Sequence, residues 1–203
     1  MFQRRLVAEI KLCTRILVQP GMSNPPEIVH LTRDVIGILI PQGTKVELPE
    51  GAEANITQSL GGSFTVMVQG HLFRIDGVDA DSLGKQPTNA PEVADDADDQ
   101  ALEKACWDQL HTCFDPEIPI DIVELGLIYE CRLEPLEGPQ RKAVVQMTLT
   151  APGCGMGDIL VEDVRSKLMR LPRIQSVDVD LTFDPPWTQD MMSEAARLQV
   201  GIL

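Results

Sequence analysis

The stretch of sequence that decides the fold is residues 142–183, which read KAVVQMTLTAPGCGMGDILVEDVRSKLMRLPRIQSVDVDLTF. Apolar side chains alternate with others in residues 142–150 and again in residues 176–183, which is typical of strands with one buried face. Between them, residues 158–170 are predicted to form a helix. Its apolar stripe, at helical spacing, is made of Leu160, Val164, Leu168 and Leu171. A strand, a helix and a strand in this order predict a crossover connection, right-handed if the two strands are parallel.

The flanking residues complete one small domain. Apolar side chains at helical spacing predict a helix that Asp98 or Asp99 caps, and alternation predicts another strand over residues 126–134. A last amphipathic segment, residues 189–199, is expected to form a helix. The inward side chains of the first and third strands are expected to be Leu127, Tyr129, Cys131 and Leu133, and Val177, Val179, Leu181 and Phe183. Together these elements predict an α+β domain over residues 101–203, built as a two-layer α/β sandwich.

The first half of the chain predicts a separate, β-rich domain over residues 22–83. Gly61-Gly62 joins two β-branched runs and is typical of a two-residue hairpin, because both glycines tolerate positive φ. Short strands at this spacing indicate a small barrel-like fold that leans on its neighbour. Residues 84–100 are expected to be an extended acidic linker, because five acids in eight residues repel one another.

Composition narrows the class of protein. The chain has 17 Lys and Arg against 31 Asp and Glu, so its formal charge of -14 argues against nucleic acid and acidic lipid surfaces. No apolar run is long enough for a membrane-spanning helix. Five cysteines at irregular spacing indicate a reducing, cytoplasmic location. Residues 1–21 are expected to be a dispensable extension, since Met22-Ser-Asn resembles a fresh amino terminus.

Cys154 is the candidate working residue. It lies in Thr150-Ala-Pro-Gly-Cys-Gly-Met-Gly157, the turn from a strand into a helix. The supporting glycines Gly153, Gly155 and Gly157 leave the sulfur with little steric cover. Because a helix amino terminus favours an anion, a thiolate at Cys154 should form readily and ligate metal or accept sulfur. The same residue could instead simply fill a crowded turn.

Further candidates surround the first helix of this domain. Asp115-Pro116-Glu117 brings two carboxylates that could bind iron, or that could be ordinary turn residues. Thr150 could hydrogen-bond the Cys154 sulfur or only end its strand. Cys113 is a weak candidate because it approaches the Asp115 turn, whereas Cys106 and Cys131 are expected in the core.

Two other classes of site were compared with this one. The three glycines do not make a dinucleotide fingerprint, which needs a longer second interval and further strands. A thiol enzyme with Cys154 as nucleophile needs a general base, and the one histidine of this domain, His111, is expected on the wrong helical face. A scaffold that docks partners through Met191, Met192 and Leu198 is a further alternative, since methionine suits adaptable surfaces.

These motifs resemble a known family. Asp115-Pro-Glu-Ile-Pro119, Thr150-Ala-Pro-Gly-Cys154 and Asp184-Pro-Pro-Trp187 are similar to the SufT family, part of a metal–sulfur-cluster assembly superfamily that includes PaaD. Thr32-Arg-Asp-Val35 and Gln58-Ser-Leu-Gly-Gly62 are similar to the amino-terminal extension of its long form, so the resemblance covers about residues 30–201.

The resemblance implies a non-enzymatic accessory factor that helps to mature or transfer iron–sulfur clusters, with the assembly machinery and recipient proteins as partners. The family's functional residues fall on Asp115, Pro116, Glu117, Thr150 and Cys154. A [2Fe–2S] cluster generally takes four protein ligands, and one confident thiolate per chain predicts that no cluster is stably held. Two chains could share a cluster as a homodimer, a recipient could complete the ligands, or Cys154 could carry iron or sulfur.

Overall fold

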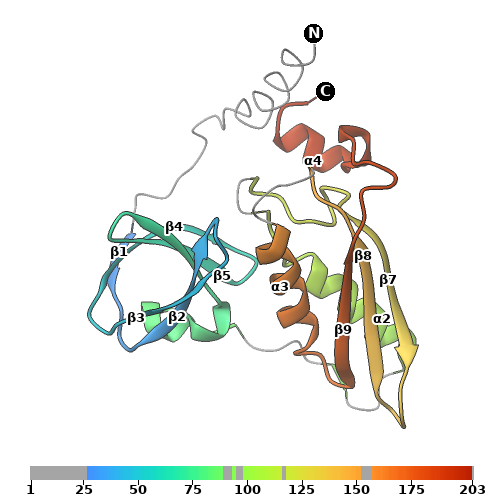
Figure 1. Ribbon diagram of the computed structural model, residues 1–203, viewed down its shortest axis with the longest axis horizontal. Coiled ribbons are helices and arrows are strands. Elements are labelled where there is room, and N and C mark those ends of the chain that lie inside the picture. The colour runs from blue at the N-terminus through green and yellow to red at the C-terminus, as the bar shows by residue number, and fades with distance from the viewer. Residues whose placement is uncertain (1–26, 89–92, 95–97, 116–117, 152–156, 203) are drawn as a thin grey trace.

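The chain folds into two units, seen side by side in the computed structural model (Figure 1). The structure describes residues 27–88, 93–94, 98–115, 118–151 and 157–202. Hereafter the β domain means residues 27–88 and the C-terminal domain means residues 98–202. The described structure is mixed α+β with a β-rich sheet domain, as the sequence predicts, and the predicted domain bounds stay a prediction.

The β domain is one six-stranded antiparallel sheet. Its strands are β1 (Glu27–His30), β2 (Val35–Ile40), β3 (Lys45–Leu48), β4 (Glu53–Leu60), β5 (Ser63–Val68) and β6 (His71–Ile75), followed by the 3-10 helix η1 (Gly77–Leu83). The hydrogen-bonded order is β1-β4-β5-β6-β2-β3, so the described ladder ends at β1 and β3. Figure 1 shows the sheet curving round its core. Closure into a barrel stays a prediction.

The hairpin at Gly61-Gly62 forms as expected. It joins β4 to β5, and the two glycines have φ of 56° and 75°, the left-handed conformation that favours glycine. Phe64, Val66 and Val68 of β5 are buried, so the alternating pattern predicted the correct inner face.

The C-terminal domain combines a three-stranded sheet with helices. Its elements are α2 (Asp99–Leu110), β7 (Ile128–Pro135), β8 (Arg141–Met147), α3 (Gly157–Leu168), β9 (Ile174–Leu181), η2 (Gln189–Met191) and α4 (Glu194–Gln199). β8 is the central strand, antiparallel to β7 and parallel to β9. The crossover between the parallel strands runs through α3, as the strand–helix–strand pattern predicts.

One apolar core holds this domain together. The stripe Leu160, Val164, Leu168 and Leu171 is buried, as are Ala143, Val145, Met147 and Leu149. Burying each large aliphatic side chain stabilises the fold by roughly 1.5–3 kcal/mol. After β9, Trp187 donates its ring N–H to the Leu125 carbonyl at 2.8 Å, which fastens the Asp184-Pro-Pro-Trp187 segment to the loop before β7.

Three details differ from the sequence-based expectations. The acidic linker is shorter than 84–100, because Asp98 caps α2 and Asp99 is its first residue, held by Arg141 and Arg173. Phe183 is 40% exposed rather than inward, because β9 ends at Leu181. The last segment is not one helix, because Ser193 caps a second start and divides η2 from α4.

Among the described helices, none has the length and apolar character needed to cross a membrane.

Candidate functional site

The predicted site residues divide into two groups. Cys154, Gly153, Gly155, Pro116 and Glu117 lie outside the described residues, so their predicted roles stay predictions. Asp115, Thr150, Gly157 and Cys113 are described and are considered in turn.

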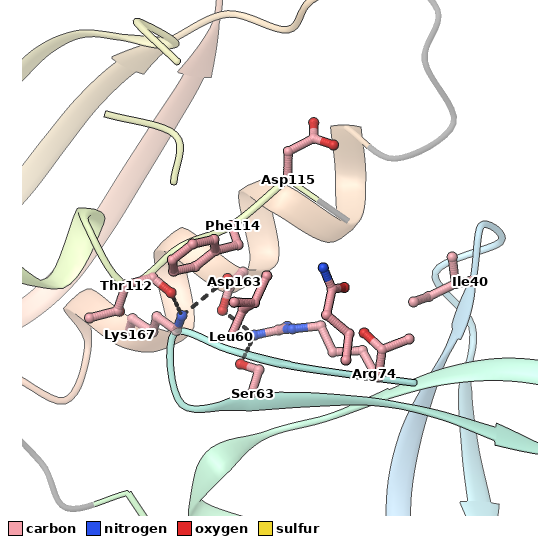
Figure 2. A pocket seen from close by; sticks show the side chains of 11 residues that line it. Ile40, Leu60, Ser63, Arg74, Thr112, Phe114, Asp115, Asp163 and Lys167 are labelled. Carbon is pink, nitrogen blue, oxygen red and sulfur yellow. Dashed lines mark hydrogen bonds and ion pairs between the residues drawn. The ribbon is translucent and has the colours of Figure 1, made fainter. Parts of the chain in front are cut away.

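Asp115 fixes its own turn. Its carboxylate accepts a hydrogen bond from the backbone N–H of Ile118 at 2.9 Å, and its own N–H donates to the Ile120 carbonyl at 3.3 Å. The turn-forming interpretation of Asp115 is therefore confirmed, and a role in binding iron stays a prediction. The side chain lines a pocket that is also lined by α3 (Figure 2).

The same turn is braced by a second carboxylate. Asp121 Oδ1 accepts the backbone N–H groups of Val123 and Glu124 at 3.0 and 2.9 Å. It also lies 3.1 Å from Nδ1 of the exposed His111. His111 therefore points away from the buried face of α2, as its spacing predicts, and it helps to order the chain between α2 and β7.

Gly157 begins α3 and allows the helix to approach the end of the sheet. A Cβ added there would lie 2.7 Å from Cδ1 of Leu149, closer than ordinary packing permits. The sequence predicts this glycine as part of a tight turn that leaves Cys154 with little steric cover. The structure gives it a packing role as well, since a side chain at this position would have to displace the side chain of Leu149.

The threonines before that loop differ from each other. Thr150 is half-buried, which leaves its side chain within reach of solvent. Thr148 is fully buried, and its Oγ1 has no hydrogen-bond partner within the part of the chain that the structure describes. Sequence analysis did not single out Thr148; the available signal was a polar residue directly ahead of Leu149 in an otherwise buried strand end. A buried hydroxyl without a partner is uncommon.

Cys113 is not poised as a metal ligand. It is fully buried, and burial, followed by the negative charge of Asp163, raises the pKa of its thiol well above the usual 9.0. A thiolate is the form that ligates metal, so the neutral thiol of Cys113 belongs with the core.

Cys106 and Cys131 also belong to the core, as expected. Both are buried, one on α2 and one on β7. A hydrogen bond to Cys131, and then burial, raise the pKa of the Cys106 thiol. Three of the five cysteines are thus enclosed in the C-terminal domain.

A charged cluster between the two domains was not predicted. Arg74 of β6 pairs with Asp163 of α3 and donates to Ser63 Oγ at 2.9 Å (Figure 2). Lys167 lies 3.4 Å from the other oxygen of Asp163. The three charged side chains are only 11%, 5% and 5% exposed. In the sequence, Asp163 and Lys167 are spaced as an ordinary surface ion pair, so nothing there signals a partner from another domain.

A second ion pair supports the same contact. Arg170 Nη2 lies 2.5 Å from Asp76 Oδ2 across the domain boundary. Burial alone would raise the pKa of Asp76, but the Val78 N–H and the charge of Arg170 outweigh burial and lower it.

The described residues contain no group of three or more His, Cys, Asp or Glu arranged to hold a metal ion.

The C-terminal domain is similar to known proteins. A family model described as iron-sulfur cluster assembly protein matches residues 103–181. A Porphyromonas gingivalis protein named Fe-S protein maturation auxiliary factor is 46% identical over 94 residues, which are 46% of this chain and 86% of that protein.

Two further relatives agree. The Staphylococcus aureus Fe-S protein maturation auxiliary factor SufT is 43% identical over 88 residues, 43% of this chain and 96% of that protein. The Bacillus subtilis factor YitW is 36% identical over 104 residues, 51% of this chain and 98% of that protein. All three relatives are matched along most of their length by about half of this chain. The chain belongs to the SufT family of Fe-S protein maturation auxiliary factors.

Proposed function

We propose that this protein is a non-enzymatic accessory factor that helps to mature iron–sulfur proteins in the cytoplasm. Its partners are the cluster assembly machinery and the recipient proteins. The observation that carries the proposal is the 46% identity with a maturation factor matched over 86% of its length. Among the residues that define the resemblance, Thr150 and Cys154 directly precede the first residue of α3 in the sequence, where the chemistry is expected.

Cys154 is the residue through which the factor acts. It lies three residues before Gly157, the first residue of the 12-residue helix α3. Unpaired N–H groups and the helix dipole favour a negative charge at such a position, so a thiolate there is stabilised relative to an exposed cysteine. Asp158 in the first turn of α3 adds a negative charge, which works against this effect.

The cargo is carried transiently. Cys106, Cys113 and Cys131 are enclosed in the core, which leaves Cys13 and Cys154 as the cysteines of one chain available to a cluster. A [2Fe–2S] cluster generally takes four protein ligands, so one chain falls short. A cluster shared between two copies or completed by a recipient, a single iron ion, and a sulfur atom are all consistent with this count. Asp115, Glu117 and Thr150 are the residues proposed to assist.

A thiol enzyme is the second candidate. The observation that favours it is the contact between His111 Nδ1 and Asp121, because a carboxylate that orients a histidine is typical of a general base. This reading requires turnover of a thiol-dependent substrate that is lost in both Cys154→Ser and His111→Ala.

The test is complementation of a strain defective in iron–sulfur protein maturation. Wild type should restore the activity of recipient enzymes, Cys154→Ser should not, and His111→Ala should behave as wild type. Cys131→Ala is the matched control, since it removes a cysteine from the core rather than from the loop. Restoration by Cys154→Ser would overturn the cysteine-based proposal and favour a scaffold that docks partners without it.

A further inference from the structure

We propose that the β domain is a built-in partner of the C-terminal domain, and that Arg74 is the positioning residue through which it fixes the two segments that carry the candidate site. The two segments are the 112–115 turn and helix α3. The role assigned to these segments rests on the proposed function, whereas the docking itself does not.

The β domain contacts both segments. Lys167 of α3 donates hydrogen bonds to two backbone carbonyls, that of Gly61 in the β4–β5 hairpin and that of Thr112 after α2. One ammonium group therefore joins the β domain, the turn and α3. Because the two carbonyls belong to different segments, the contact fixes both the separation and the relative orientation of those segments.

The hairpin fits closely against the turn. A Cβ added to Gly61 would lie 1.7 Å from the Thr112 carbonyl oxygen, so any side chain at this position would clash with the Thr112 backbone. The β2–β3 turn approaches α3 near its first turn, since a Cβ on Gly43 would lie 3.5 Å from Cγ1 of Ile159. The β domain thus reaches the end of α3 that follows the cysteine loop.

Arg74 supplies the charge that makes this arrangement stable. Asp163 and Lys167 are each only 5% exposed, and both belong to α3. Arg74 comes from the β domain and pairs with Asp163. A buried carboxylate that loses a cationic partner becomes costly, so the domains are held together by a contact that depends on charge. Polar interfaces of this kind are typical of domains that can separate.

The cluster also adjoins the candidate site. Thr112, whose carbonyl oxygen accepts a hydrogen bond from Lys167, lies three residues before Asp115 in the sequence. Arg74, Asp163, Thr112 and Asp115 line one pocket (Figure 2). The three curated relatives are matched over 86%, 96% and 98% of their length by about half of this chain, which leaves them little room for a domain of this size. These three relatives therefore have little room for the domain that supplies Arg74 in this chain.

Hydrogen exchange of the full chain tests the docking. Arg74→Asp places two carboxylates together, so peptides covering 112–115 and 157–164 should exchange at least about tenfold faster, a change of about 1.4 kcal/mol in opening free energy. The charge-swapped pair Arg74→Asp with Asp163→Arg should restore protection to within about twofold of wild type. Peptides from β9 should be unchanged in every variant, which shows that the C-terminal domain stays folded.

Arg33→Asp is the matched control. Arg33 pairs with Asp79 and Asp81 inside the β domain, away from α3, so the same change of charge there should leave both peptides protected. If Arg74→Asp exchanges no faster than Arg33→Asp, or if the swapped pair remains as fast as Arg74→Asp alone, the docking role of Arg74 is overturned.

The maturation assay tests the positioning role. Arg74→Asp should lower recipient activation, and the swapped pair should recover it, an effect that mere loss of a surface charge would not show. Faster exchange with unchanged activation would overturn the positioning role. Failure of the proposed function is separate, because it appears as activation by Cys154→Ser, whatever the exchange results are.

Discussion

The core of the C-terminal domain and its contact with the β domain are built on opposite principles. Val164 and Leu168 are fully buried in the apolar core of the C-terminal domain. Asp163 and Lys167, one position earlier on the same helix, are equally enclosed but carry charges. One helix can therefore take part in two interfaces, one stabilised by apolar packing and the other by buried ion pairs. The apolar face holds the domain together, and the charged face depends on the neighbouring domain.

Removal of the central charge of this contact should have the largest effect. Asp163→Ala leaves Arg74 and Lys167 buried without their carboxylate, which should destabilise the chain by about 3–5 kcal/mol. Denaturant unfolding of the full chain measures the loss. A loss below about 1 kcal/mol would mean that both cations reach water easily, and the contrast between the two faces would fail.

Truncation on the apolar face should cost slightly less. Leu168→Ala creates a cavity in the core and should lower the free energy of unfolding by about 2–4 kcal/mol. Met169→Ala is its neighbour and control, because Met169 is 45% exposed and should change stability by less than about 0.5 kcal/mol. Similar losses in the two variants would show that α3 is not seated as described.

Comparing two glycine substitutions should separate the cost of backbone strain from the cost of the close contact at the hairpin. Gly61→Ala places a methyl group on a residue with φ of 56° and against the Thr112 carbonyl, and should cost about 2–3 kcal/mol. Gly138→Ala shares the positive φ of 63° but has nothing within 4 Å, so it should cost about 1 kcal/mol. Thermal unfolding of both variants gives the difference, which measures the close approach of the two domains. Equal losses would contradict that approach.

Acid should weaken the domain contact by a smaller amount. The pKa of Asp76 is lowered in the folded chain, so its contribution to stability is present above its unfolded pKa of about 4 and is lost as pH falls through the lower folded value. Unfolding measured from pH 5 to pH 2.5 should therefore show a smaller loss for Asp76→Asn than for wild type. Parallel curves would show that Arg170 does not stabilise the Asp76 carboxylate.

The sequence predicted those parts of the fold that depend on local pattern. Alternation and helical spacing located β8, α3 and β9, and the glycine pair located the hairpin, because each pattern reports which side chains face a core. The Arg74 cluster was missed for a physical reason. A pair such as Asp163 and Lys167 is usually solvated, and only the tertiary arrangement brings an arginine from 89 residues away.

For the candidate site, the sequence predicted the local backbone structure better than it predicted which side chains are buried. The turn around Asp115 and the start of α3 at Gly157 were located correctly, because proline, aspartate and glycine have strong local preferences. The burial of the weak candidate Cys113 was not foreseen, since spacing alone places it near the turn but does not reveal that it is fully enclosed. The likeness of the β domain to the extension of the long SufT form stays a prediction.

The short connection between the domains has a consequence of its own. Thr88 is bonded to the Gly62 carbonyl and Asp98 caps α2, so nine residues separate these two points, and Val93 between them packs against the C-terminal core. Such a tether spans at most about 36 Å and keeps the two surfaces at an effective concentration of roughly millimolar. An intrinsically weak association would then be mostly closed at rest, and a competing protein could still displace it without unfolding either part.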